Sequence, residues 1–138
     1  MVFSDTINVA TKGFSDIVDI TPALKKILEK SGLHDGIAAV FCPGSTGAIT
    51  TIEYESGVLE DLKRAIEKLA PSGVPYAHDA RWGDGNGFSH VRAALLGPSL
   101  TVPIVDRELT LGTWQQIVFI DFDNRRRQRR IQVQLVGD

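Results

Sequence analysis

The sequence predicts an α+β fold with largely antiparallel sheet and about three helices. Segments with the alternating apolar pattern of β-strands lie at both ends of the chain, and segments with helical periodicity lie between them. The length of 138 residues suits one domain, so residues 1–138 are expected to form a single unit. Hydrophobic residues make up 43% of the chain and charged residues 23%, a balance typical of a globular protein with a packed core.

Four strands are expected in the first half of the chain. The first two would form a hairpin that turns at Lys12-Gly13. The third is continuously apolar, which suits a strand buried on both faces, and the fourth is rich in β-branched residues. These strands span residues 3–9, 14–20, 36–42 and 48–53.

Three helices are expected, and each has recognisable start or stop residues. Thr21 could cap the first helix, which has Pro22 at its first position and ends at Gly32. Ser56 could cap the second helix, which would end before Pro71. The third is short and begins at Asn86 or Ser89. Strands then follow over residues 100–104, 109–111, 114–122 and 131–135.

The bulk properties exclude several classes of function. A net charge of −2 gives no general attraction to nucleic acid or to a membrane surface. No apolar stretch approaches the length of a membrane span. The single cysteine, Cys42, cannot form an internal disulfide and lies in an apolar run, so we expect a buried thiol in a cytoplasmic protein.

The densest side-chain chemistry lies in a glycine-rich run between His78 and His90. Glycines at positions 83, 85 and 87 allow the backbone to approach a bound group closely. Imidazole is a common ligand of zinc and similar metals, and an open site would need a third ligand. Asn86 could cap the third helix, which would place His90 about one turn into it. The alternative is that both histidines only bond to their own backbone.

Two further features are candidates for binding or catalysis. Ser45 and Thr46 lie in a turn between two strands, where exposed amides and hydroxyls could bind an anion, although a simple turn is equally consistent. Glu53 ends the fourth strand and could serve as a base or ligand. A solvated surface carboxylate is the alternative for Glu53.

Five arginines lie within residues 125–130. By strand parity, Arg125, Arg127 and Arg129 share the inward set with Ile131, Val133 and Leu135. An inward-facing arginine requires an anion, either a carboxylate or a ligand phosphate. A solvated hairpin end is the alternative.

Taken in order, these residues resemble the YjbQ family, members of which are described as secondary thiamine-phosphate synthases. The resemblance covers most of the chain. It rests on Cys42-Pro-Gly-Ser-Thr-Gly-Ala-Ile-Thr50 leading to Glu53, on Tyr76-x-His78, Asn86-x-x-x-His90, Ala94 to Ile104, Leu111-Gly-Thr-Trp-Gln115, Asp121-Phe-Asp123 and the arginine run. One departure is Gly44, which stands where many members carry a histidine.

The resemblance implies a YjbQ-like sandwich that assembles as a homotrimer, with sites near subunit boundaries. It implies that His78, His90, Asn86 and Glu53 line a polar pocket able to hold a divalent metal such as Zn²⁺ or Mg²⁺, with His78 and His90 as ligands. The implied reaction joins a pyrimidine methyl diphosphate to a thiazole phosphate and releases diphosphate.

These implications define the expected function and its rivals. The substrate would be a phosphorylated small molecule, bound by Ser45, Thr46, Arg127 and Arg129. The rivals are a metal-dependent hydrolase and a non-enzymatic trimer that binds a ligand. The absent histidine at Gly44 favours the last of these.

Overall fold

Two antiparallel sheets form the framework of the computed structural model, which describes residues 1–138. The strands are β1 (Val2–Thr11), β2 (Asp16–Asp19), β3 (Gly36–Phe41), β4 (Gly47–Ile52), β5 (Ser99–Val105), β6 (Glu108–Leu109), β7 (Gln116–Asp121) and β8 (Arg127–Gly137). The larger sheet has the order β1-β8-β3-β5-β6, and the smaller sheet has the order β2-β7-β4. The α+β fold class is therefore confirmed.

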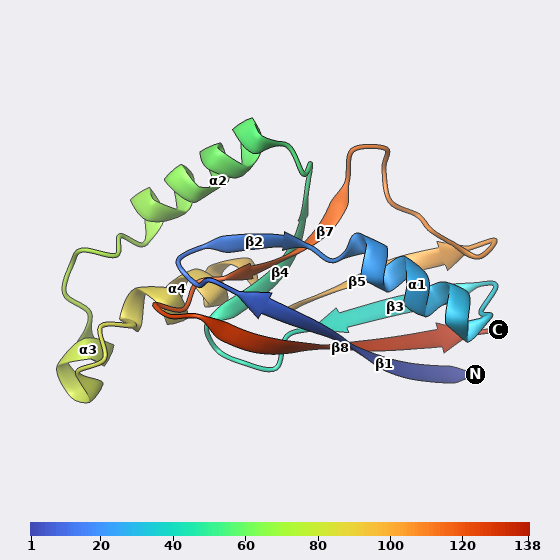
Figure 1. Cartoon of the computed structure of the whole chain (residues 1–138), viewed down its shortest axis with the longest axis horizontal. Coiled ribbons are helices and arrows are strands. Elements are labelled where there is room, and N and C mark those ends of the chain that lie inside the picture. The colour runs from blue at the N-terminus through green and yellow to red at the C-terminus, as the bar shows by residue number, and fades with distance from the viewer.

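Four helices complete the fold: α1 (Thr21–Ser31), α2 (Ser56–Leu69), α3 (Ala77–Trp82) and α4 (Gly87–Leu96). Helices α2, α3 and α4 gather at one end of the molecule, whereas both termini lie at the other end (Figure 1). A bilayer-spanning helix is not found, since all four are too short or too polar for that role.

Strand β7 separates two apolar layers because its side chains alternate between them. Ile117 and Phe119 pack with α1 and the inner face of the larger sheet. Val118 and Ile120 pack on the opposite side, where Ile66 of α2 contributes to the same cluster. Each layer removes apolar side chains from water, and this burial is the main favourable term in folding.

The expected N-terminal hairpin is wrong. β1 pairs with β8 in the larger sheet, and β2 pairs with β7 in the smaller sheet. The turn at Lys12-Gly13 therefore carries the chain from one sheet to the other. Gly13 suits this crossing because an added Cβ would lie 2.5 Å from the carbonyl oxygen of Arg125.

Two helix caps also differ from expectation. The N-cap position of α1 is occupied by Ile20, not by Thr21, and no side chain caps this helix. The Thr21 hydroxyl instead accepts a hydrogen bond from the Ile117 amide of β7, at 2.7 Å. Glu55, not Ser56, caps α2, because its carboxylate accepts from the amides of Gly57 and Val58. The hydrogen bonds from these two backbone amides lower the pKa of Glu55, and the one from Val58 has the larger effect.

Strand β3 is buried on only one face in the single chain. Ala38 and Val40 are fully covered, whereas Ile37 and Phe41 are 44% and 45% exposed on the opposite face. The apolar run was expected to be covered on both faces, but no helix or second sheet covers the outer face of the larger sheet in the single chain.

Candidate functional site

The rings of His78 and His90 lie next to each other on two short helices, α3 and α4. Their ring centroids are 4.4 Å apart, with 40° between the ring planes. Asp79 of α3 accepts a hydrogen bond from the amide of Gly87, the first residue of α4, at 2.8 Å. Gly87 permits this approach because a Cβ there would lie 2.6 Å from Tyr76. Local backbone contacts thus hold the two imidazoles together.

Two carboxylates face the same imidazole. Nδ1 of His78 lies 3.3 Å from Oδ1 of Asp84 and 3.6 Å from Oδ1 of Asp79. This nitrogen is buried, yet it makes no hydrogen bond of acceptable geometry. One ligand atom from each of the three residues lies within 4.8 Å of the others. A mixed nitrogen and carboxylate set of this kind suits a divalent cation.

A buried polar network adjoins the start of α4, and Asp123 is its centre. Oδ2 of Asp123 accepts from the Thr46 hydroxyl at 3.0 Å, from the Asn86 amide at 3.4 Å and from Nη2 of Arg127 at 2.9 Å. Burial alone would raise the pKa of Asp123, but the hydrogen bonds from Arg127 and Thr46 outweigh it and hold that pKa below its ordinary value.

Asp121 and Arg129 form a bidentate pair in the same network. Nε and Nη2 of Arg129 each donate to one carboxylate oxygen of Asp121 at 2.8 Å. The Asp121 side chain is fully buried, and that of Arg129 is 12% exposed. The hydrogen bonds to Asp121 raise the pKa of Arg129 despite its burial. The anion required by this inward-facing arginine is therefore a carboxylate of β7.

A cavity of about 220 Å³ opens beside His90. Its lining includes Gly44, Ser45 and Gly47 of the β3–β4 connection and Pro98 after α4. Gly44 leaves the cavity open toward the guanidinium beneath it, since an added Cβ would lie 3.2 Å from Nη1 of Arg129. The guanidinium of Arg129, paired with Asp121, thus lies next to Gly44, which lines the same cavity as His90.

The structure brings most of the predicted site residues to one end of the molecule. Residues His78 and His90 face each other, Ser45 shares the cavity with His90, and Asn86, Thr46, Arg127 and Arg129 belong to the adjoining network. The Thr46 hydroxyl is already engaged, donating to Asp123 and accepting from Arg129 at 2.7 Å. Asn86 likewise acts within the network, accepting from the Ser89 hydroxyl and the Asn124 amide.

Glu53 lies apart from the other candidates in the single chain. It follows β4 at the end opposite Gly47, which is about 20 Å away at the usual rise of an extended strand. It instead lines a hollow with Tyr54 and Trp114. The prediction that Glu53 shares a pocket with His78 and His90 therefore does not hold within one subunit.

Sequence reasoning assigned no role to four aspartates at this end of the molecule. Asp79 and Asp84 lie in the same glycine-rich run as His78, so their position near a histidine was a usable signal. Asp121 and Asp123 share the parity of Ile117 and Phe119 on β7, and this parity directs them toward the arginines of β8.

Comparison with known proteins gives the family. A sequence model described as "UPF0047 protein YjbQ-like" matches residues 5–138. The chain belongs to the YjbQ (UPF0047) family. The UPF0047 protein of Methanothermobacter thermautotrophicus is 40% identical over 136 residues, covering 99% of this chain and 93% of its own. That of Archaeoglobus fulgidus is 41% identical over 116 residues, covering 84% and 88%.

Solved structures of similar proteins confirm the fold. A YjbQ-like protein from Sulfolobus solfataricus superimposes with a TM-score of 0.94 at 34% identity, over 100% of this chain and 99% of that one. A hypothetical protein from Aeropyrum pernix gives 0.91 at 29% identity, over 99% of both chains. The Sulfolobus protein is described as having unknown function, so the family membership carries no activity with it.

Proposed function

We propose that the YjbQ-family site at His78 and His90 is an active site for a phosphorylated small molecule, with a divalent cation as cofactor. The observation that carries the proposal is the orphaned Nδ1 of His78. This nitrogen is buried, lacks a hydrogen bond and faces two carboxylates. A buried polar atom without a partner is costly, and a bound cation would satisfy it.

The chain supplies groups for each part of such chemistry. His78, Asp79 and Asp84 would hold the cation, which when bound would neutralise phosphate charge. His90 lines the adjoining cavity, where its imidazole could transfer a proton to or from a substrate. Asn86 and Thr46 would keep the surrounding network in place through Asp123.

Phosphate binding would rest on exposed groups more than on Arg129. The guanidinium of Arg129 is paired with Asp121, so little of its charge is available to a phosphate. Arg127 is one-third exposed; its Nη2 donates to Asp123, and its Nε is buried without a hydrogen-bond partner. Ser45 is exposed at the cavity. These groups are compatible with the thiamine-phosphate synthase reaction, in which a diphosphate leaves and needs charge neutralisation.

A second candidate is a metal-dependent hydrolase. One histidine and two carboxylates would leave coordination positions open for water, as catalytic metal sites require. In this case added Mn²⁺ or Zn²⁺ would support hydrolysis of a phosphate ester, and no second substrate would be needed.

We also propose that the protein is a homotrimer whose site lies near a subunit boundary. Val91 and Leu95 follow His90 on α4 and are 41% and 61% exposed. Apolar side chains in this position are typical of a surface covered by another subunit. Size-exclusion chromatography with light scattering would measure the mass, and a monomer would contradict the proposal.

The test is an activity assay with matched histidine variants. Purified protein would be supplied with the pyrimidine diphosphate and thiazole phosphate, or with phosphate esters alone, each with Mg²⁺, Mn²⁺ or Zn²⁺. We expect His90→Ala to lower turnover by about 10²- to 10⁴-fold, the usual contribution of a general acid or base. His34→Ala, at the far end of the molecule, is the control. Equal turnover in both variants would contradict the assignment.

A further inference from the structure

A second cavity, of about 550 Å³, lies outside the histidine site and has a different lining. Phe14 and Ser15 of the β1–β2 connection, Lys63 of α2, Phe88 and Arg92 of α4 and Asn124 after β7 contribute to it. Neither His78 nor His90 contacts this space. The volume falls within the range of small-molecule sites, which is about 300 to 1,000 Å³.

The backbone beside this cavity is strained. Phe14 and Ser15 have φ values of 53° and 66°, a left-handed conformation that large side chains rarely adopt. Their amides donate to the carbonyl oxygens of Asp123 and Asp121, both at 2.8 Å, so the surrounding structure imposes the conformation. The result is a Phe14 ring that is 65% exposed. Strain of this kind is concentrated at functional sites.

A buried guanidinium forms part of the cavity wall. Arg92 is 5% exposed and donates to the Ala70 carbonyl at 2.9 Å, to the Ser15 hydroxyl at 3.2 Å and to the Glu67 carboxylate. Its guanidinium carbon lies 4.8 Å from the centre of the Phe88 ring. Three of its five N–H groups are used in these bonds, which leaves two donors.

The charge balance of the lining favours an anion. Lys63 and Arg92 provide two positive charges, whereas Glu67 provides the single negative charge among the lining residues. Lys63 forms no ion pair in the chain, in contrast to Arg92. An unpaired ammonium beside a desolvated guanidinium attracts carboxylates and phosphates.

We propose that this cavity binds an aromatic ring that carries an anionic group. The ring packs against the exposed face of Phe14, and the anion binds the ammonium of Lys63 with support from the Asn124 amide and the free donors of Arg92. The strained turn is retained because it presents Phe14 to the ligand. The two cavities share no lining residue, and the one direct link to the cation ligands is the hydrogen bond from the Asn124 side chain to the Asp84 carbonyl, at 2.9 Å.

Binding of phenyl phosphate, followed by calorimetry and by amide chemical shifts, tests the proposal. Benzoate, benzyl alcohol and inorganic phosphate are the comparison ligands. We expect phenyl phosphate and benzoate to bind with Kd below about 1 mM and to shift the amides of Phe14, Lys63 and Asn124. Benzyl alcohol, which lacks the charge, and inorganic phosphate, which lacks the ring, bind at least about tenfold more weakly. Equal binding of inorganic phosphate overturns the aromatic part of the proposal.

Variants at the two principal contacts separate binding from folding. Lys63→Gln weakens phenyl phosphate about tenfold, whereas Lys68→Gln, an exposed lysine on the same helix, changes nothing. Phe14→Gly weakens binding about threefold or more but keeps or raises Tm, because glycine adopts the left-handed conformation without strain. Phe14→Tyr keeps the affinity. Wild-type affinity in Lys63→Gln and Phe14→Gly overturns the proposal.

A further variant distinguishes this proposal from the proposed function. His78→Asn leaves the affinity for phenyl phosphate unchanged, because His78 does not line this cavity. A protein that fails the turnover assay but still binds phenyl phosphate would retain the cavity and lose only the histidine site. Loss of phenyl phosphate binding in His78→Asn overturns the independence of the two sites.

Discussion

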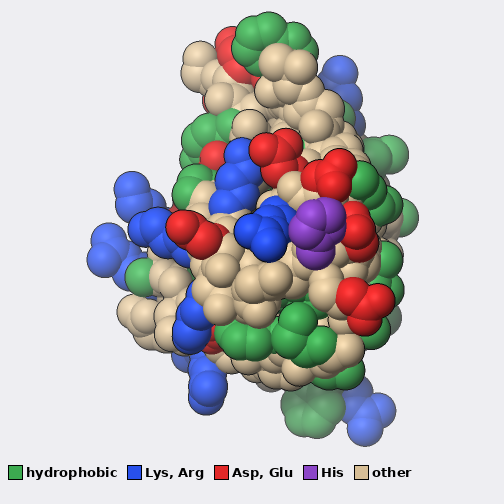
Figure 2. Space-filling view, turned by 90° about the vertical axis from the view of Figure 1, so that its right-hand side faces the viewer, with side chains coloured by type: hydrophobic (Ala, Val, Ile, Leu, Met, Phe, Trp, Pro, Cys, Tyr) green, Lys and Arg blue, Asp and Glu red, His purple; other side chains and the backbone are tan.

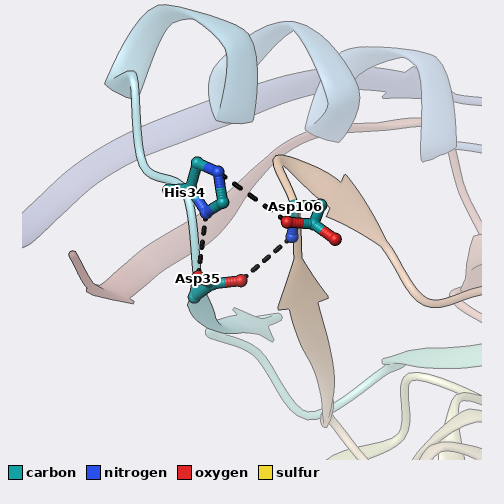
Figure 3. Close-up of side chains that lie close together, drawn as sticks. All are labelled: His34, Asp35 and Asp106. Carbon is teal, nitrogen blue, oxygen red and sulfur yellow. Dashed lines mark hydrogen bonds and ion pairs between the residues drawn. The ribbon is translucent and has the colours of Figure 1, made fainter.

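Both ends of the molecule bring a histidine together with two aspartates, but these residues are more enclosed at one end than at the other. At the end that holds the termini, the side chains of His34, Asp35 and Asp106 are 49%, 60% and 84% exposed (Figure 3). At the end formed by α3 and α4, those of His78, Asp79 and Asp84 are 30%, 26% and 48% exposed. A second imidazole also lies 4.4 Å from His78.

The exposed group already satisfies its own hydrogen-bonding capacity. Nδ1 of His34 lies 2.8 Å from one oxygen of Asp35, and the other oxygen accepts from the Asp106 amide at 3.0 Å. These bonds fasten the β5–β6 turn to the connection before β3 (Figure 3). Acidic and basic side chains are interspersed on the face around this end (Figure 2). The same residue types therefore form a surface clasp here and a candidate site at the other end, because His78, unlike His34, has a buried ring nitrogen without a hydrogen-bond partner.

The largest expected effect comes from the buried network of the enclosed end. Arg129→Ala would leave the Asp121 carboxylate buried without its bidentate partner, so we expect a loss of about 3–5 kcal/mol in the free energy of unfolding. Urea unfolding would measure it. Arg130→Ala, which removes an exposed arginine next in sequence, is the control and should have little effect. A small effect at position 129 would show that the network does not hold this end together.

The affinity for a cation should distinguish the group around His78 from the group around His34. We expect His78→Asn to weaken Zn²⁺ binding by about 100-fold, since one ligand of three is lost, and His34→Asn to leave it unchanged. Calorimetry with Zn²⁺ alone would measure both affinities. The opposite order would move the metal site to the exposed end and reverse the comparison.

Acid should weaken the enclosed end through Asp123. Its pKa is lower in the folded chain than the ordinary value of 3.8, so its contribution to stability is present above that value and is lost as the pH falls through the folded pKa. We expect the free energy of unfolding to fall between about pH 5 and about pH 3, with a shallower slope in Asp123→Asn. Other carboxylates with lowered pKa, including Glu67, give the variant its residual slope. Equal slopes in wild type and variant would contradict the role of Asp123.

The smallest expected effect is at the exposed clasp. His34→Ala should change Tm by no more than a degree or two, because exposed ion pairs contribute little to stability. Thermal unfolding at about pH 6 and about pH 8 would measure it. A large loss at either pH would show that the clasp is structural, and the contrast between the ends would fail.

Local patterns in the sequence were sufficient for much of this fold. The apolar stripe of α1, with Leu24, Ile27 and Leu28, is buried as its spacing indicates. The parity of β8 also places Ile131, Val133 and Leu135 inward. Sheet membership could not be read in the same way, because the turn at Gly13 is compatible with either a hairpin or a crossing between sheets.

The candidate site could be predicted only in part from the sequence, for a related reason. His78 and His90 are close in the chain and meet on helices linked by Asp79 and Gly87. The partners of Arg129 and Thr46 come from distant strands, and their identity depends on how β7 faces β8. Arg129 was predicted to need an anion, but sequence alone could not choose between Asp121 and a ligand.

The end of β7 also has a consequence for how the chain folds. Asp121 and Asp123 face the arginines of β8, whereas Phe122 between them is fully buried on the opposite side. A shift of one residue in strand pairing would direct Phe122 at Arg129 and bury two carboxylates in an apolar layer. Mispaired forms of the smaller sheet are therefore destabilised by buried charge as well as by lost packing. The sequence at the end of β7 thus helps to fix the register of the strand.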